Sequence, residues 1–396
     1  MFDILGDTSR GTAVVIAKTI CSKYPDTFAD LIDKINLGAG WESLSAHIYT
    51  AINYRKAKER TKRPRALGAL YSDNDDDDEN ARPLPQTTPR KQDEYGCVDY
   101  QPLLPEGETP SSQETKRKRL ITLYQTSPDI FEGEVKQLMN DTYPTQRGVI
   151  NDCSRGSGLT QSVFQKWPFL NNDKVLVAHA QQLLGIEVNE IWRRNLRKVT
   201  KIRNFFKYEY VTKIFIAKKK GIELPDPFVK NTIKEEKRQS QNDTRSELSL
   251  TLVIFPLIVY YFEEDRDFLF IIVENTLTIE EIIGKVPNAA PTLIIRGTSL
   301  YDETASCSVL LEKAFEIKVG NILDGFLLTF LCYFIFGCKY PKELQCTLEF
   351  IQRFIILINP PEGSKRKCKK RKQTSYNPKV LKLINILNEA LSAITL

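Results

Sequence analysis

The side chains suited to acid–base or nucleophilic chemistry are few in this sequence, and they are widely separated. The chain has two histidines, His47 and His179, and a Ser–His–Asp or Cys–His site would need one of them. Each lies within an expected helix, and we interpret each as an ordinary helix residue. The carboxylates at 263–265, and Glu280 with Glu281, are adjacent along the chain, and adjacent groups rarely converge on one substrate atom. We therefore expect no enzyme activity and no cofactor.

Neither the cysteines nor the glycine-rich segment has the spacing of a metal or phosphate site. Cys332, Cys338 and Cys346 lack zinc-ligand spacing. Cys332 and Cys346 fall in apolar helices, where a cysteine acts as a small hydrophobic residue. The segment 6–12 (GDTSRGT) places two glycines as a phosphate-binding loop does, but Thr12 stands where that loop needs a lysine. We expect a capped helix start there, and no metal site.

Clusters of lysine and arginine carry the strongest functional signal. They favour nucleic acid because they release counterions from a polyphosphate. One cluster covers the outer face of a long helix expected from about residue 187, and another extends an amino-terminal helix. The candidate nucleic-acid-binding residues are Arg193, Arg194, Arg197, Lys198, Lys201 and Arg203 on the first helix, and Arg55, Lys56, Lys58 and Arg60 on the second.

Aromatic residues lie among the cations of the long helix, and two interpretations of them remain open. Trp192, Phe205, Phe206 and Tyr208 would form a stacking surface for bases if they were exposed. Alternatively, Trp192 and Phe206 belong to a buried stripe, and the basic face is merely solvated. The members of that stripe are Trp192, Leu196, Val199, Ile202 and Phe206.

Three basic stretches have the composition of nuclear import signals. They comprise Lys62, Arg63 and Arg65; Lys116, Arg117, Lys118 and Arg119; and Lys365, Arg366, Lys367, Lys369, Lys370, Arg371 and Lys372. We therefore expect the protein in the nucleus, with the cytoplasm as the alternative.

Size and composition indicate folded modules joined by polar linkers. The chain has 396 residues, 41% of them hydrophobic, and a net charge of +6, which allows two or three domains. Residues 1–20 do not form a signal peptide, and the cysteines form no closely spaced pairs, so we expect a reduced intracellular setting. The apolar stretches 248–262 and 325–337 are shorter than the roughly 18–20 residues of a spanning helix, so we expect no membrane partner.

The expected fold is multidomain, with two mainly α-helical modules joined by a disordered acidic linker and followed by an α+β carboxy-terminal domain. The small helical domain with its basic extension covers 1–60, including helices before Tyr24, at 28–35 and from Trp41. The acidic, proline-rich linker covers 61–112. The basic helical domain covers 113–222, a second polar linker covers 223–246, and the α+β domain covers 247–396 with a basic tail at 364–373 and a terminal helix.

The carboxy-terminal domain is organised around its densest apolar stretch, 321–360. We predict one helix near 322–336 and a second from Pro341, both covering a sheet. The second carries an apolar stripe of Leu344, Leu348, Ile351, Ile355 and Ile358. The expected strands are 268–273, 292–295, 307–311 and 315–319. The segment 248–262 is either a helix bent at Pro256 or a pair of buried segments, and Asn377 with Pro378 starts a final helix.

Several segments in a common order resemble a fish-expanded family of vertebrate proteins labelled sterile alpha motif domain-containing protein 3-like. They are FDILGDTSRGTA (2–13), CSKYPDTFAD (21–30), YGCVDYQP (95–102), LPEGET (104–109), WPFL (167–170), LLGIEV (183–188) and YPKELQCTLEFIQRFIILINP (340–360). The resemblance covers most of the chain but implies no catalytic or ligand residues. The five-helix sterile alpha motif itself is not found, although 183–199 resembles its last helix. The aromatic segment 95–102 is expected to dock on a folded neighbour.

These observations favour a non-enzymatic protein that associates with nucleic acid or chromatin through its basic helix and tails, with DNA or RNA as the partner. The alternative is a protein–protein interaction scaffold whose basic blocks serve only nuclear import and solubility.

Overall fold

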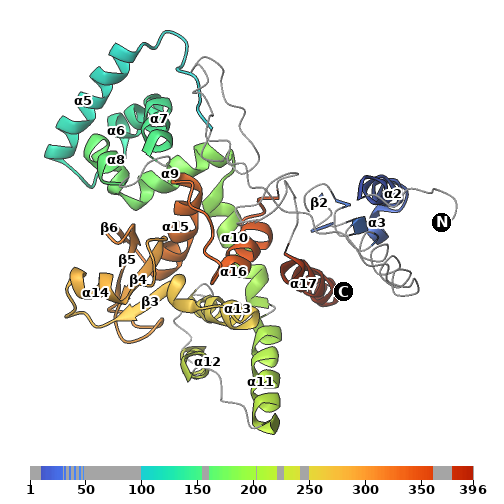
Figure 1. Cartoon of the computed structure of the whole chain (residues 1–396). Helices are drawn as coiled ribbons and strands as arrows, with labels where there is room; N and C mark the ends of the chain where they lie inside the picture. The colour runs from blue at the N-terminus through green and yellow to red at the C-terminus, as the bar shows by residue number, and fades with distance from the viewer. Residues whose placement is uncertain are drawn as a thin grey trace, which may run out of the picture. The chain divides into compact units, whose positions relative to one another are not determined.

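The computed structural model describes residues 10–29, 31–32, 35–36, 40–41, 44–45, 48, 100–153, 160–201, 203–220, 227–240, 249–359 and 377–395 (Figure 1). The chain divides into two compact units, Met1–Arg90 and Lys91–Leu396. Helices predominate in the described residues, and a small four-stranded mixed sheet lies in the second unit. The expectation of mainly helical segments followed by an α+β segment is confirmed at this level.

The first unit contains α2 (Arg10–Lys23), α3 (Pro25–Phe28) and an antiparallel pair, β1 (Leu31–Ile32) with β2 (Ile35–Asn36). The helix expected at 28–35 is wrong, because the extended backbone of Ala29, with φ −75° and ψ 144°, ends α3 after one turn. The buried stripe of α2 is Ala13, Ala17 and Cys21. The side chain of Tyr24, just after α2, is 51% exposed.

The second unit begins with a set of helices that starts earlier than expected. They are α5 (Pro110–Thr126), α6 (Gly133–Asp141), α7 (Tyr143–Cys153), α8 (Thr160–Lys166), η1 (Pro168–Asn171) and α9 (Asp173–Leu184). Thr109 caps α5 in a reciprocal capping box with Ser112, so residues 110–112 are not linker. Gln101 Nε2 donates to Pro144 O at 2.8 Å, and Asn151 Nδ2 donates to Tyr100 O at 2.8 Å. The expected docking of this aromatic segment is confirmed for Tyr100 and Gln101, while 61–99 lies outside the described residues.

The described residues of the long basic helical segment are α10 (Val188–Lys201) and α11 (Arg203–Lys220), and Ile202 between them lies outside the described residues. The linker expected at 223–246 is wrong in its central part, where Pro227–Ser240 forms α12. Val229, Thr232, Glu236 and Gln239 are buried on one face of α12. This helix was not predicted because three of the four buried residues are polar, so the segment has no apolar stripe at helical spacing.

The sheet has the order β3-β4-β5-β6. Its strands are β3 (Phe270–Val273), β4 (Thr292–Arg296), β5 (Ser306–Leu311) and β6 (Phe315–Val319), all close to the predicted ranges. β3 and β4 are parallel, with α14 (Ile279–Lys285) between them along the chain, and the other two pairings are antiparallel. Ile271 and Ile294 pack with Ile282 of α14, while α15 (Ile322–Ile335) lies against β4, β5 and β6.

Close approach of α15 to the sheet depends on Gly325. A Cβ atom at this position would lie 2.6 Å from Leu293 Cδ1, closer than non-bonded carbon atoms pack. The hydrogen atom of the glycine therefore sets the distance between the helix and β4.

The second predicted core helix differs from expectation. It forms α16 (Gln345–Phe350), continues as a π-helix, η4 (Ile351–Ile355), and lies against α13 and α17 rather than the sheet. The segment 248–262 is a pair of elements, η2 (Ser249–Val253) and α13 (Ile254–Phe262). Pro256 lies in the first turn of α13, where its missing N–H has no intrahelical partner to lose. The terminal helix is confirmed as α17 (Pro378–Thr395), with Asn377 Oδ1 accepting from Lys379 N at 3.0 Å.

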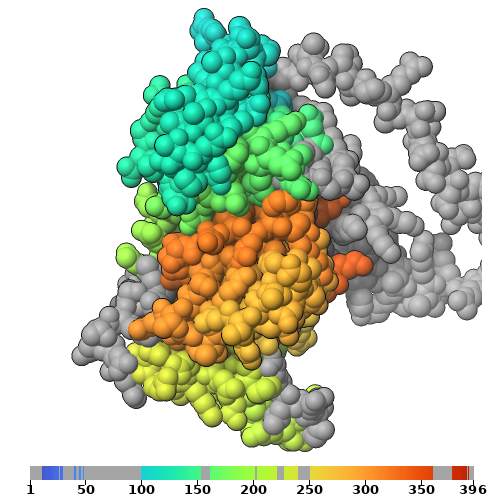
Figure 2. All heavy atoms as spheres, turned by 90° about the vertical axis from the view of Figure 1, so that its left-hand side faces the viewer, coloured from blue at the N-terminus to red at the C-terminus, as the bar shows by residue number. Residues whose placement is uncertain are grey.

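The helices and the α+β part, which we predicted as separate ranges, lie in one compact unit. Figure 2 shows the segments coloured cyan and green directly against the orange segment. Phe164 of α8 packs its ring against Phe315 and Phe336, with centroid distances of 5.3 and 6.1 Å. Arg147 of α7 also donates a hydrogen bond to the end of α15.

Candidate nucleic-acid interface

The inner face of α10 is anchored in the core of the second unit. Trp192 is 2% exposed and stacks on Phe255, with the ring centroids 5.8 Å apart. Asn195 Nδ2 donates to Ile355 O at 2.7 Å. Thr200 Oγ1 lies 2.8 Å from Thr251 Oγ1. Because these contacts fix the rotation of the helix, they also fix which side chains point outward.

The outer face of α10 carries three exposed arginines. Arg193, Arg194 and Arg197 are all exposed, and within the described ranges none of them forms an ion pair. Their spacing places them on one side of the helix. The exposed carboxylate of Glu190 lies one turn earlier and reduces the local positive charge. The side chain of Lys198 is half-buried, and that of Lys201 lies outside the described residues.

The two cations at the start of α11, Arg203 and Lys207, share one buried carboxylate. Arg203 Nε lies 3.4 Å, and Lys207 Nζ 2.6 Å, from the carboxylate of Glu236 on α12, whose side chain is 2% exposed. Sequence reasoning missed this arrangement because α12 was assigned to a linker. We therefore leave Arg203 out of the interface.

The aromatic residues divide between the two interpretations. Trp192 and Phe206 are 2% and 1% exposed, so the buried-stripe interpretation is confirmed for them, and they cannot stack on bases. Phe205 is half-buried, with its ring 6.2 Å from that of Tyr261. Tyr208 is 69% exposed and alone of the four points largely into solvent.

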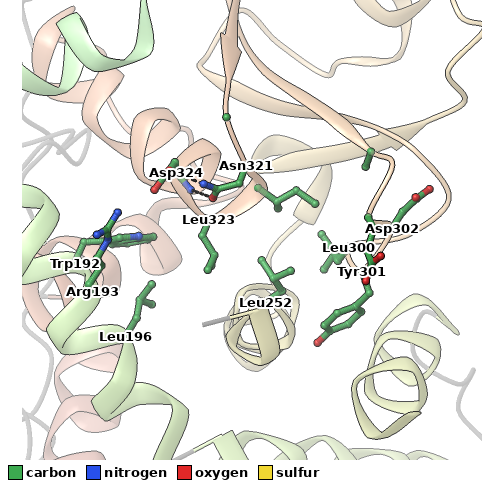
Figure 3. Close-up of a pocket in the computed structure, with 14 residues that line it drawn as sticks. Trp192, Arg193, Leu196, Leu252, Leu300, Tyr301, Asp302, Asn321, Leu323 and Asp324 are labelled. Carbon is green, nitrogen blue, oxygen red and sulfur yellow. Dashed lines mark hydrogen bonds between the residues drawn. The ribbon is translucent and has the colours of Figure 1, made fainter. Parts of the chain in front are cut away.

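A pocket of about 420 Å³ lies beside Arg193, between α10, the loop after β4 and the start of α15 (Figure 3). Asp302, Glu303 and Asp324 contribute carboxylates to its lining, against one guanidinium. Hydrogen bonds from Thr304 and Thr298 hold the pKa of Asp302 well below its usual range, so this group is ionised. The pocket therefore repels phosphate, and the interface is the outward ridge of Arg194 and Arg197 with Arg193 at its edge.

The predicted import residues of α5 are held in ion pairs on a folded helix. Lys116 lies 2.6 Å from Glu108 and 2.7 Å from Asp141. Arg117 lies 2.7 Å from Glu114, and Arg119 lies 2.8 Å from Glu134. Lys118 is exposed. The remaining candidate residues lie outside the described residues: Arg55, Lys56, Lys58, Arg60, Lys62, Arg63, Arg65, Lys365, Arg366, Lys367, Lys369, Lys370, Arg371 and Lys372.

His179 belongs to a buried polar cluster with Arg147. Its Nε2 lies 3.5 Å from Arg147 Nη1, and its Nδ1 lies 3.3 Å from Gln146 Oε1. Burial, with a smaller effect of the charge on Arg147, holds the pKa of His179 well below its usual value. The imidazole is therefore neutral, and at 4% exposed it is sealed from solvent. An arginine inside the protein is rare, and no local sequence pattern predicted this cluster.

The other groups considered for chemistry have structural surroundings. Burial raises the pKa of the Cys346 thiol to about 12 and that of Cys332 well above its usual value. The carboxylate of Glu264 accepts from Cys346 N at 2.7 Å and Thr347 N at 2.8 Å, capping α16. Among the residues described, no three or more His, Cys, Asp or Glu side chains are grouped as a metal site would require. None of the described helices combines the length and the apolar character needed to cross a bilayer.

Comparisons of this chain with protein-family models, curated proteins and solved structures find no match. The resemblance carried by segments such as 2–13 and 340–360 therefore stays a prediction.

Proposed function

We propose that this protein associates with nucleic acid or chromatin through the outer face of α10. The observation that carries the proposal is the exposure of Arg193, Arg194 and Arg197 without carboxylate partners among the described residues. Guanidinium groups bind phosphate oxygens in a bidentate manner, and the anchored inner face of α10 removes the entropic cost of ordering the helix on binding. The expected compartment is the nucleus, with import through basic stretches outside the described residues.

A salt titration tests this function. Three phosphate contacts give a slope of about −2.7 in log K against log salt, so duplex DNA binding should weaken about 40-fold between about 50 and 200 mM salt. The measurement is fluorescence anisotropy with labelled duplex DNA and single-stranded RNA. Affinity that does not depend on salt, or binding that is absent near physiological salt, would favour a protein-interaction scaffold.

Charge reversal locates the interface. The double variant R194E/R197E should abolish binding without unfolding, because both side chains are exposed. The matched control is K285E/K318E, which changes the net charge by the same amount at two exposed lysines of α14 and β6. Equal loss of binding in both variants would show that only the overall charge matters and would overturn the assignment to α10.

A specific observation also favours the scaffold alternative. The outer face of α11 exposes apolar side chains that the fold leaves uncovered, with Tyr208 69% and Phe215 68% exposed. Such a stripe marks an interaction site when its members lie together.

A further inference from the structure

The outer face of α11 is an apolar stripe that ends in a cationic turn. Tyr208, Val211 and Phe215 are 69%, 60% and 68% exposed, and Ile216 beside them is 44% exposed. The spacing of the first three, i, i+3 and i+7, aligns them along one side of the helix. Lys218, Lys219 and Lys220 are exposed in the last turn; Lys218 and Lys219 continue the same side, and Lys220 flanks them. We call these seven residues the α11 face.

The opposite side of α11 shows that this exposure is not due to a loosely held helix. Phe206 and Tyr210 are 1% and 3% exposed. Tyr210 packs on Tyr260 of α13, with the ring centroids 4.9 Å apart. Lys213 Nζ lies 3.0 Å from a carboxylate oxygen of Glu263. Figure 1 shows α11 crossing α13 and continuing past it, so the α11 face is presented by a helix with a fixed rotation.

The distribution of charge on α11 separates a protein partner from nucleic acid. Lys207 and Lys213 are turned to the carboxylates of Glu236 and Glu263, so the α11 face before residue 218 exposes apolar side chains and no free cation. A phosphate backbone needs cations along its whole track. Val211 and Ile216 cannot stack on bases, whereas aliphatic side chains pack well into the apolar stripe of another helix.

A second copy of this chain is a poor occupant. In a parallel pair of α11 faces the three lysines would meet the same three lysines. In an antiparallel pair they would approach the start of α11, where the one carboxylate, Glu209, is half-buried and cannot balance three lysines. The partner must instead supply negative charge at one end of its apolar stripe.

We propose that the α11 face binds an acidic amphipathic helix of another protein, antiparallel to α11. The apolar stripe of that helix would cover Tyr208, Val211 and Phe215, and its acidic first turn would meet Lys218, Lys219 and Lys220. Antiparallel packing is favoured because carboxylates are most stable in the first turn of a helix, at the positive end of its dipole. That end then lies beside the cationic last turn of α11. This inference develops the scaffold alternative and does not depend on the nucleic-acid contact of α10.

The test uses the full chain and a labelled synthetic helix of about 20 residues, long enough to hold helical structure. The peptide has three acidic residues in its first turn and leucines at i, i+3 and i+7 spacing. A second peptide has the same composition with the acidic residues moved to the last turn, and a third is scrambled. We expect the first peptide to bind at least tenfold more tightly than either control. Equal binding of all three, or no binding of the first, overturns the proposal.

Variants of the chain locate the site. Replacing Val211 and Phe215 by serine should weaken binding of the first peptide at least tenfold, because losing the burial of one apolar side chain at the interface raises Kd by about a factor of ten. The triple variant K218E/K219E/K220E should weaken it comparably and remove its dependence on salt. The control variant I130S replaces an apolar residue 52% exposed before α6 and should bind as the wild type does.

Two further arms separate this inference from other partners. Vesicles of anionic lipid and single-stranded RNA are titrated against the wild type and V211S/F215S. We expect the wild type and this double variant to have the same affinity for the vesicles and the same affinity for the RNA. If the serine variants weaken RNA or vesicle binding and leave peptide binding unchanged, the α11 face belongs to that partner and the proposal is wrong. Failure of R194E/R197E to alter DNA binding would refute the nucleic-acid proposal alone.

Discussion

Arg147 Nη1 donates a hydrogen bond of 2.7 Å to the main-chain oxygen of Ile335, the last residue of α15. The guanidinium is fully buried, and Nη2 donates to Asn151 Oδ1 at 2.7 Å. No carboxylate of the described residues pairs with it, so its charge is stabilised by the negative end of the α15 dipole and by neutral acceptors. Burial lowers the pKa of Arg147 to about 10, which keeps it protonated at neutral pH. One cation therefore joins α7 to the helix that covers the sheet.

Replacement of Arg147 by methionine should destabilise the second unit by about 2–4 kcal/mol. The variant keeps most of the side-chain volume but leaves the buried oxygens of Ile335 and Asn151 without this donor. Urea unfolding followed by circular dichroism measures the difference. The exposed Arg194→Met is the control, expected within about 0.5 kcal/mol of the wild type. Similar stabilities for the two variants would mean that the buried cation contributes little.

The stability of the second unit should fall as the pH drops below 6.5, the ordinary pKa of histidine. The native imidazole of His179 has a lowered pKa and stays neutral, whereas the unfolded chain takes up a proton there. The unfolded state therefore binds more protons, and stability is lost by about 1.4 kcal/mol per pH unit in this window. His179→Gln should flatten the profile between pH 7 and pH 5. A slope unchanged by this substitution would show that other groups dominate the acid response.

Arg194 and Arg203 should affect nucleic-acid binding differently, although both are arginines of the same basic segment. Arg194→Gln removes a cation that has no carboxylate partner among the described residues and should reduce the salt slope by about 1. Arg203→Gln should leave that slope unchanged, because Arg203 lies 3.4 Å from Glu236. Anisotropy titrations over a series of salt concentrations measure both. A larger effect at Arg203 would place the phosphate track on α11 instead.

Nuclear import should depend on the basic block at 365–372 and not on α5. Alanine at all lysines and arginines of this block is expected to shift a fluorescent fusion toward the cytoplasm. Lys118→Ala should leave its distribution unchanged, since Lys116, Arg117 and Arg119 are held in ion pairs on a helix. Quantitative imaging of nuclear and cytoplasmic signal compares the two. Cytoplasmic retention caused by Lys118→Ala would assign import to α5.

Gly325→Ala should destabilise the fold by about 1–3 kcal/mol, because the new methyl group meets the fully buried Leu293. Leu293→Val shortens that side chain and should recover part of the loss in the double variant. A double-mutant cycle in urea isolates the coupling between the two positions. Strict additivity of the two changes would mean that the strain lies elsewhere.

The strands and the terminal helix could be predicted because local patterns determine them. β3 to β6 are short runs of β-branched and aromatic residues between turn signals, and Asn377 with Pro378 forms a local helix start. The continuation of α16 as a π-helix at Ile351–Ile355 could not be predicted. The segment is apolar on so many sides that its sequence pattern fits an α-helix and a π-helix equally well. Tertiary packing decides between the two.

The candidate interface was predicted only in part, for a related reason. Helical spacing correctly placed Arg194 and Arg197 outward, but it left Trp192 open between a base-stacking surface and the buried stripe in which it lies. It could not show that Glu236 pairs with Arg203 and Lys207, because that pairing joins residues about 30 positions apart on separate helices. Nor could it show that the apolar side chains of α11 stay uncovered, since exposure depends on which elements pack against the helix.

Three buried cysteines can report local opening of the fold, because they react only when they become exposed. Cys307 lies in β5, Cys332 in α15 and Cys346 in α16, and all three are buried. Burial raises the pKa of each thiol, so the thiols stay protonated. An alkylating reagent therefore cannot reach them, and would meet no reactive thiolate, while the fold is closed. The rate of labelling at each cysteine then measures how often the sheet, the covering helix α15 and α16 open, and whether they open together.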